Sequence, residues 1–305
     1  MAESGQLLKD SMYALGAVAL WGLAFPLIQI GLEDFSPILL GFLRFALATS
    51  VLFVFVLIRY RFSEIKAAVG SEWKSLLALG ILYVTIPNIT QNMGLEHGTS
   101  SIASVIQSSG PVMTLIFAVM LLKEKMTKLK GIGTVIAMAG TLLLVANGGL
   151  SLEDEDFVSN VLILISATSY GLAWVSAKRM IERNSPVLVI GLGLVFGTLL
   201  LGLAVPFEGD MKAVYDTESV VNLVVLGLLC AGVSSVLYLS SLEREEVSRM
   251  AFLIYLMPVF ASLFAWILMD QSVEAMTAVC GAIIVVGIII ANRSERPKPS
   301  GGAEN

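Results

Sequence analysis

The chain has 305 residues, of which 56% are hydrophobic and only 14% are charged, and its formal net charge is −5. Soluble domains average about a quarter charged residues, so this composition excludes a soluble globule and indicates a protein embedded in a lipid bilayer. The two cysteines, Cys230 and Cys280, both lie in apolar runs and offer neither a disulfide framework nor a metal-ligand spacing.

Apolar runs dominate the chain from one end to the other. A helix needs about 20 apolar residues to cross a hydrocarbon core of about 30 Å. Ten such runs follow one another, at 11–31, 37–58, 73–93, 100–122, 129–146, 158–177, 186–207, 220–242, 250–269 and 275–291. We therefore expect an all-α integral membrane protein with ten transmembrane helices and no soluble domain.

The basic residues predict the orientation of these helices. Lys and Arg concentrate in cytoplasmic loops of membrane proteins. With the N-terminus inside, Lys212 is the basic residue of an outer loop and Arg44 lies within the second span, so the other 17 of the 19 Lys and Arg face the cytoplasm. We expect a multi-pass protein of the cell membrane with both termini cytoplasmic. The net negative charge comes from the outer loops and indicates no nucleic-acid partner.

The two halves of the sequence repeat one another. A shift of 147 residues places Pro111-Val112 on Pro258-Val259, and a shift of 149 places Gly22-Leu23-Ala24 on Gly171-Leu172-Ala173. Each copy holds five spans, an odd number, so the second copy enters the membrane from the opposite side. This predicts a cytoplasmic N-terminus at 1–10, a first repeat at 11–147, an acidic external linker at 148–157, an inverted second repeat at 158–292 and a cytoplasmic tail at 293–305.

Three segments carry a resemblance to a known family: "LWGLAFPLIQIG", "SPILLGFLRFALA" and "KEKMTKLKGIGTVIAMAG", in that order. Together with the duplicated five-span pattern, they resemble the EamA-type transporters of the drug/metabolite transporter superfamily over residues 14–292. The resemblance implies a secondary transporter, expected to be an exporter, of small organic metabolites such as amino acids, related solutes or drugs. It also implies a central cavity formed by the first, third and fourth helices of each half, and the inverted repeats predict that this cavity opens to alternate sides of the membrane. Gln271 and Gly193 depart from the first half, which has Glu124 and Arg44 there.

Prolines at matching places predict broken helices. A proline removes a helical hydrogen bond, and helices interrupted at equivalent places in two halves point to the binding site of a transporter. We expect Pro111 and Pro258 to line or gate the cavity, and Pro26 and Pro87 either to do the same or to shape packing alone.

Polar residues cluster on single faces of the predicted spans, where polar groups are costly in lipid. They are Tyr83, Asn88, Gln91 and Asn92 in the third span, Ser104, Gln107 and Ser108 in the fourth, Ser235 and Tyr238 in the eighth, and Tyr255 in the ninth. Two interpretations stay open, because such faces hydrogen-bond a polar solute or fasten helices to one another.

Aromatic pairs spaced four residues apart occupy matching places on the first helix of each half: Trp21 and Phe25, then Tyr170 and Trp174. They predict either a cavity wall against an apolar part of the substrate or ordinary core packing.

Arg44 is the one charge well inside a span. An unpaired guanidinium there is costly, so we expect it to meet helix-end carbonyls, an acidic loop residue such as Glu96 or Asp270, or the carboxylate of a substrate. Because the resemblance includes this arginine across substrates of different charge, a structural or gating role is favoured.

The sequence carries little that suggests catalysis. No Asp or Glu lies in the middle of a span, so coupling to an embedded acid is unsupported, and the one histidine, His97, has no companion. We expect no catalytic residues, no metal and no cofactor. The expected partners are a small-molecule substrate and the lipid bilayer, and the protein is expected to be a monomer or a homodimer. The alternative is a channel or a scaffold without carrier activity.

Overall fold

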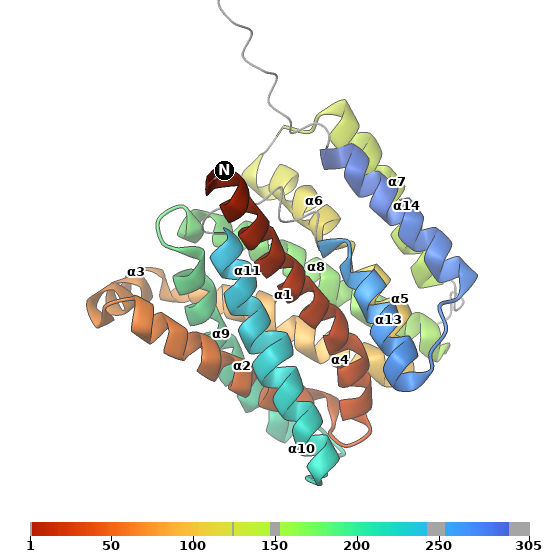
Figure 1. Ribbon diagram of the computed structural model, residues 1–305, viewed down its shortest axis with the longest axis horizontal. Helices are drawn as coiled ribbons and strands as arrows, with labels where there is room; N and C mark the ends of the chain where they lie inside the picture. The colour runs from red at the N-terminus through yellow and green to blue at the C-terminus, as the bar shows by residue number, and fades with distance from the viewer. Residues whose placement is uncertain (1, 124, 147–152, 243–253, 293–305) are drawn as a thin grey trace, which may run out of the picture.

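The protein folds as a bundle of helices (Figure 1). The computed structural model describes residues 2–123, 125–146, 153–242 and 254–292, so parts of the predicted linker and ninth span and the tail lie outside the described residues. Eight of the helices in these ranges are long and apolar enough to cross a membrane, and two further apolar helices, at Met257–Met269 and Ala275–Ala291, are shorter. The predicted ten-helix, all-α membrane protein is confirmed.

The first five spans are built from eight helical segments. They are α1 (Ala2–Leu32), α2 (Pro37–Arg59), α3 (Phe62–Gly80), the π-helical η1 (Ile81–Thr85), α4 (Ile86–His97), α5 (Ser100–Gln107), α6 (Gly110–Leu122) and α7 (Lys128–Val145).

The last five spans repeat this plan. They are α8 (Glu155–Ile181), α9 (Pro186–Ala204) with the 3-10 turn η3 (Val205–Phe207), α10 (Thr217–Val224), the π-helical η4 (Val225–Val233), α11 (Ser234–Leu242), α13 (Met257–Met269) and α14 (Ala275–Asn292). The π-helical segments fall at equivalent places, because η1 shifted by 147 residues lies inside η4.

The start of α1 and the end of α14 lie at the same end of the bundle, which we call the terminal end; the opposite end is the far end (Figure 1). The helices α1 and α8, which begin the two halves, run in opposite directions across the bundle. This is the relation that inverted copies require.

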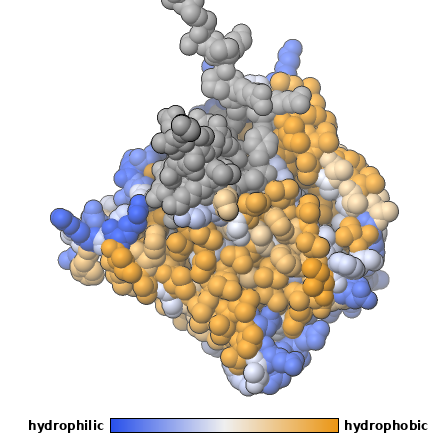
Figure 2. Space-filling model, in the orientation of Figure 1, coloured by the Kyte–Doolittle hydropathy of each residue, from blue (hydrophilic) through white to orange (hydrophobic). Residues whose placement is uncertain are grey.

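The surface of the bundle is divided into an apolar zone and polar zones on either side of it. Figure 2 shows an apolar band across the middle of the molecule, with hydrophilic surface near α3 on one side and near the start of α10 on the other. Large apolar side chains are well exposed within the spans, such as Val135 on α7, Leu199 on α9 and Ile267 on α13. An exposed apolar belt of this kind is suited to lipid.

Glycines bring the two halves into close contact at equivalent places. A Cβ on Gly22 of α1 would lie 2.6 Å from the Cβ of Phe260 on α13, and a Cβ on Gly171 of α8 would lie 2.6 Å from the Cβ of Met113 on α6. Gly22 and Gly171 are repeat equivalents, as are Met113 and Phe260. The first helix of each half therefore packs directly on the fourth helix of the other half.

In the same reciprocal way, the third helix of each half packs on the second helix of the other half. A Cβ on Gly80 would lie 2.5 Å from the backbone nitrogen of Gly197 on α9, and a Cβ on Gly227 would lie 2.7 Å from the Cβ of Leu47 on α2. The fifth helices, α7 and α14, approach each other through Gly133 and Gly287. Small residues at these crossings let helix backbones pack closely where lipid supplies no hydrophobic driving force.

The third span begins earlier than predicted. Its helix starts at Phe62 rather than at 73 and continues to His97, with a non-helical kink at Glu72. The charged residues between Glu64 and Lys74 ended the apolar run in the sequence, yet the chain before the kink is an amphipathic helix that buries Ile65 and Ala68 against the core and leaves its charged side chains exposed.

Two helix breaks lie next to Pro111 and Pro258, but they are not the proline kinks that the sequence predicted. Ser108 and Ser109 form a turn between α5 and α6, and Tyr255 and Leu256 form the equivalent turn before α13. Pro111 and Pro258 lie in the first turn of the helices that follow, where a missing N–H costs nothing. Pro111 and Pro258 thus begin helices instead of interrupting them, whereas Pro87 lies within the continuous third span, directly after the π-helical η1, and Pro26 is interior to α1.

Candidate substrate-binding site

Five aromatic side chains from both halves gather where the first and third spans meet, and we call them the aromatic group: Trp21, Tyr83, Tyr170, Trp174 and Tyr238. The rings of Trp21 and Tyr238 are 4.8 Å apart between centroids. Tyr83 lies edge-on to Tyr170 at 5.4 Å and to Trp174 at 5.9 Å. Trp21 and Trp174 both pack against the cluster that contains Tyr238, and each of the three ring contacts joins one half to the other.

Phe25 is not part of this group. Its side chain is 3% exposed and belongs to the large hydrophobic core between α1 and the neighbouring helices. The spacing of four residues after Trp21 placed it on the predicted wall, whereas its repeat equivalent Trp174 does reach the aromatic group.

A buried polar group lies next to the aromatic one on α2 and α4. Arg44 donates to the side-chain oxygen of Asn88, and the Asn88 amide donates to the carbonyl of Val84 at 2.6 Å. The Asn92 amide donates to the carbonyl of Pro37 at 2.8 Å, and Gln91 is buried beside them. The bonds of Arg44 with Asn88 and of Asn92 with Pro37 link α4 to α2, but the Asn92 side-chain oxygen has no partner although it is buried.

Arg44 does not meet the acidic partners expected of it. Its side chain is 4% exposed, its Nε is buried without a partner, and its guanidinium carbon lies 5.0 Å from the ring centroid of Phe45. Among the described residues, no carboxylate forms an ion pair with it.

The predicted serines mostly bond to their own helices. Ser104 donates to the carbonyl of Ser101 at 2.8 Å, Ser108 to that of Val105 at 2.6 Å and Ser235 to that of Ala231 at 2.6 Å. Such bonds satisfy a hydroxyl without a solute. The Gln107 side-chain oxygen is buried without a partner, and Tyr255 is buried in the core before α13.

Gln29 closes the far end between the halves, and the sequence analysis did not single it out. Its amide nitrogen donates to the carbonyl of Gly98 at 3.0 Å, and its oxygen accepts from the Ser100 hydroxyl at 2.7 Å and from the Gln271 amide at 3.1 Å. One side chain of α1 thus holds the start of α5 and the segment after α13. The sequence signal was a lone amide in the otherwise apolar "LIQIG".

Glu208 makes a second contact at the far end, also missed by the sequence analysis. Its carboxylate accepts from the Ser36 hydroxyl at 2.7 Å and from the backbone N–H groups of Ile38 at 2.6 Å and Leu39 at 3.0 Å. The N–H groups at a helix start lack partners within the helix, and a carboxylate satisfies them well. A residue of the second half therefore caps α2 of the first half.

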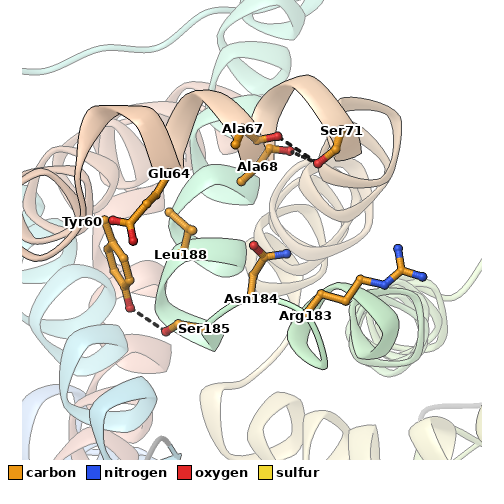
Figure 3. Close-up of a pocket in the computed structure, with 9 residues that line it drawn as sticks. All are labelled: Tyr60, Glu64, Ala67, Ala68, Ser71, Arg183, Asn184, Ser185 and Leu188. Carbon is orange, nitrogen blue, oxygen red and sulfur yellow. Dashed lines mark hydrogen bonds between the residues drawn. The ribbon is translucent and has the colours of Figure 1, made fainter.

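A cavity of about 400 Å³ opens at the terminal end, away from the predicted site (Figure 3). Its walls come from α3 and from the segment joining α8 to α9, and include Tyr60, Glu64, Ser71, Asn184 and Leu188. The Tyr60 hydroxyl donates to Ser185 at 2.6 Å on one side of it. In the part of the chain that the structure describes, no group of three or more His, Cys, Asp or Glu side chains forms a candidate metal site.

Comparison with known proteins gives the following relatives. The sequence model of the EamA-like transporter family matches residues 9–146 and 158–293. An uncharacterized transporter of Archaeoglobus fulgidus is 26% identical over 90% of this chain and 96% of its own length. A probable terminal-alkyne amino-acid exporter of Streptantibioticus cattleyicolor is 23% identical over 94% of each chain. A solved structure with 19% identity superimposes with a TM-score of 0.65 over 94% of this chain and 99% of its own, which shows a shared fold.

Proposed function

The chain belongs to the EamA-like transporter family, and from that premise we propose that it is a secondary carrier that exports small organic metabolites by alternating access. The proposed halves are 11–147 and 158–292. The proposed substrates are amino acids or related solutes, in keeping with the amino-acid exporter to which the chain is similar.

The observation that carries the proposal is the reciprocal packing of the halves around the aromatic group. The first helix of each half packs on the fourth helix of the other, through Gly22 and Gly171. Two similar halves that run in opposite directions can exchange conformations, and this exchange opens a site between them to alternate sides. The aromatic group lies on this shared interface and supplies apolar surface for a solute.

The far end supplies the gate in this proposal. With both termini cytoplasmic, the far end faces outward, so the bonds of Gln29 with Gln271 and of Glu208 with α2 hold the outer side closed. Release of solute to the outside requires these bonds to break while the opposite side closes. A channel, which is the alternative function, does not require two mutually exclusive conformations.

Transport by the purified protein in liposomes tests the proposal. Liposomes loaded with an unlabelled amino-acid mixture should accumulate a labelled amino acid by exchange, and the uptake should saturate with concentration. A Trp21→Ala, Tyr83→Ala double variant should lose most of this uptake, while Phe207→Ala, on an exposed residue outside the aromatic group, should retain it. Unitary currents across a planar bilayer, or uptake that never saturates, would indicate a channel and contradict the carrier.

A further inference from the structure

Arg44 is a cation without a counter-charge inside the bundle. A buried guanidinium has five N–H donors and cannot lose its charge. Here the Asn88 side-chain oxygen is its one hydrogen-bond acceptor among the described residues, and its Nε is buried without any. Of the three kinds of partner expected from the sequence, helix-end carbonyls and acidic loop residues are absent around it among the described residues. The sequence favoured a structural or gating role for this arginine, but the fixed partners that such a role requires are missing here, so the remaining partner is an anionic group that arrives with the substrate.

The position of Arg44 fits this role because it joins the polar and aromatic groups. Asn88, which accepts from Arg44, lies five residues after Tyr83 on the same continuous helix, about 7 Å along its axis. Tyr83 contacts Tyr170 and Trp174 of the other half. A small solute with its anionic end at Arg44 therefore places its apolar part against the aromatic group.

The second half offers no equivalent cation. The repeat equivalent of Arg44 is Gly193, whose Cα lies against Leu79, where an added Cβ would be 2.9 Å from that side chain. The charge is therefore a feature of one half alone and is not required by the repeated fold.

We propose that Arg44 binds the carboxylate of the transported solute, so that the substrates are small carboxylates with an apolar part, such as aliphatic or aromatic amino acids. This inference rests on the proposed function and narrows its substrate class. Asn88 is a positioning residue in this site because it holds one side of the guanidinium.

Thermal unfolding of the purified full-length protein with matched ligands tests the inference. The probes are L-leucine and L-phenylalanine, with leucinamide and phenylalaninamide as the same molecules without a carboxylate. The wild type should be stabilised at concentrations about tenfold or more lower for each acid than for its amide, since a charged hydrogen bond is being removed. Arg44→Gln should abolish this preference, Arg44→Lys should keep part of it, and Arg61→Gln, on an exposed arginine outside the site, should keep all of it.

The ligand-free midpoints separate binding from a structural role. A guanidinium held only for a substrate costs desolvation in the free protein, so Arg44→Gln should unfold at the wild-type temperature or above it. A lower midpoint with the acid preference intact would show a structural arginine and overturn the inference.

Two further outcomes distinguish this inference from the carrier proposal. Equal stabilisation by acids and amides, or saturable liposome uptake of uncharged solutes but not of amino acids, overturns the role of Arg44 and leaves the carrier standing. Absence of saturable uptake for every solute class counts against the carrier itself.

Discussion

Substitution of Gly22 by alanine tests the contact between α1 and α13. The added Cβ would lie 2.6 Å from the Cβ of Phe260 and 2.9 Å from the backbone nitrogen of Ala261, and neither of these atoms is the mobile end of a side chain. Overpacking of this kind costs about 1–3 kcal/mol, while the change from glycine to alanine within a helix returns about 1 kcal/mol. The two helices have to move apart at this contact, so we expect Gly22→Ala to destabilise the protein by up to about 2 kcal/mol and to lower transport.

Gly16 on the same helix provides the matched control, because the nearest atom to an added Cβ there is 3.9 Å away on Leu237. Gly16→Ala should therefore be neutral or stabilising, and Gly171→Ala, the repeat equivalent of Gly22→Ala, should be destabilising. The assay is the unfolding midpoint of each variant in detergent beside its uptake in liposomes. Equal midpoints for the Gly16 and Gly22 variants would refute the close crossing.

Three further predictions concern the far end and the helix breaks. Glu208→Ala should lower the free energy of unfolding by about 1 kcal/mol, as loss of a helix cap does, whereas Asp210→Ala on the same exposed loop should leave the midpoint unchanged; equal effects of the two would contradict the cap. Pro111→Ala and Pro258→Ala should each reduce liposome uptake while the protein still inserts and elutes as a single species, with Pro206→Ala as the control, and wild-type flux in both would remove these prolines from the mechanism. Gln29→Ala should speed labelling from outside of a cysteine placed at Ser104, and an unchanged labelling rate would show that Gln29 does not close the far end.

The spans could be predicted from the sequence because length and hydropathy alone set them. Local sequence patterns also predict the order of the spans, the resemblance to the family and the helix breaks beside Pro111 and Pro258. The early start at Phe62 could not, because the helix before the kink buries only a narrow face, Ile65 and Ala68, and is otherwise polar and exposed. A rule that ends a span at charged residues does not distinguish such an amphipathic helix from a loop.

The site was only partly predictable for a related reason. Spacing of three and four residues placed Ser104, Gln107 and Ser108 on one helical face, but it cannot show that the serine hydroxyls turn back to their own helix. The spacing also put Phe25 beside Trp21, although it points into the core. Gln29 and Glu208 escaped notice because their partners are loop and helix-end groups that only the tertiary structure brings to them.

Alternating access is tested most directly by locking the far end. Gln29→Cys and Gln271→Cys, introduced together after replacement of Cys230 and Cys280, place two thiols where the amides now meet at 3.1 Å. A short bifunctional methanethiosulfonate reagent should then abolish exchange in liposomes, and a reducing agent should restore it, while either single cysteine variant should be unaffected by the reagent. Full exchange in the cross-linked double variant would contradict a carrier that opens and closes at this end.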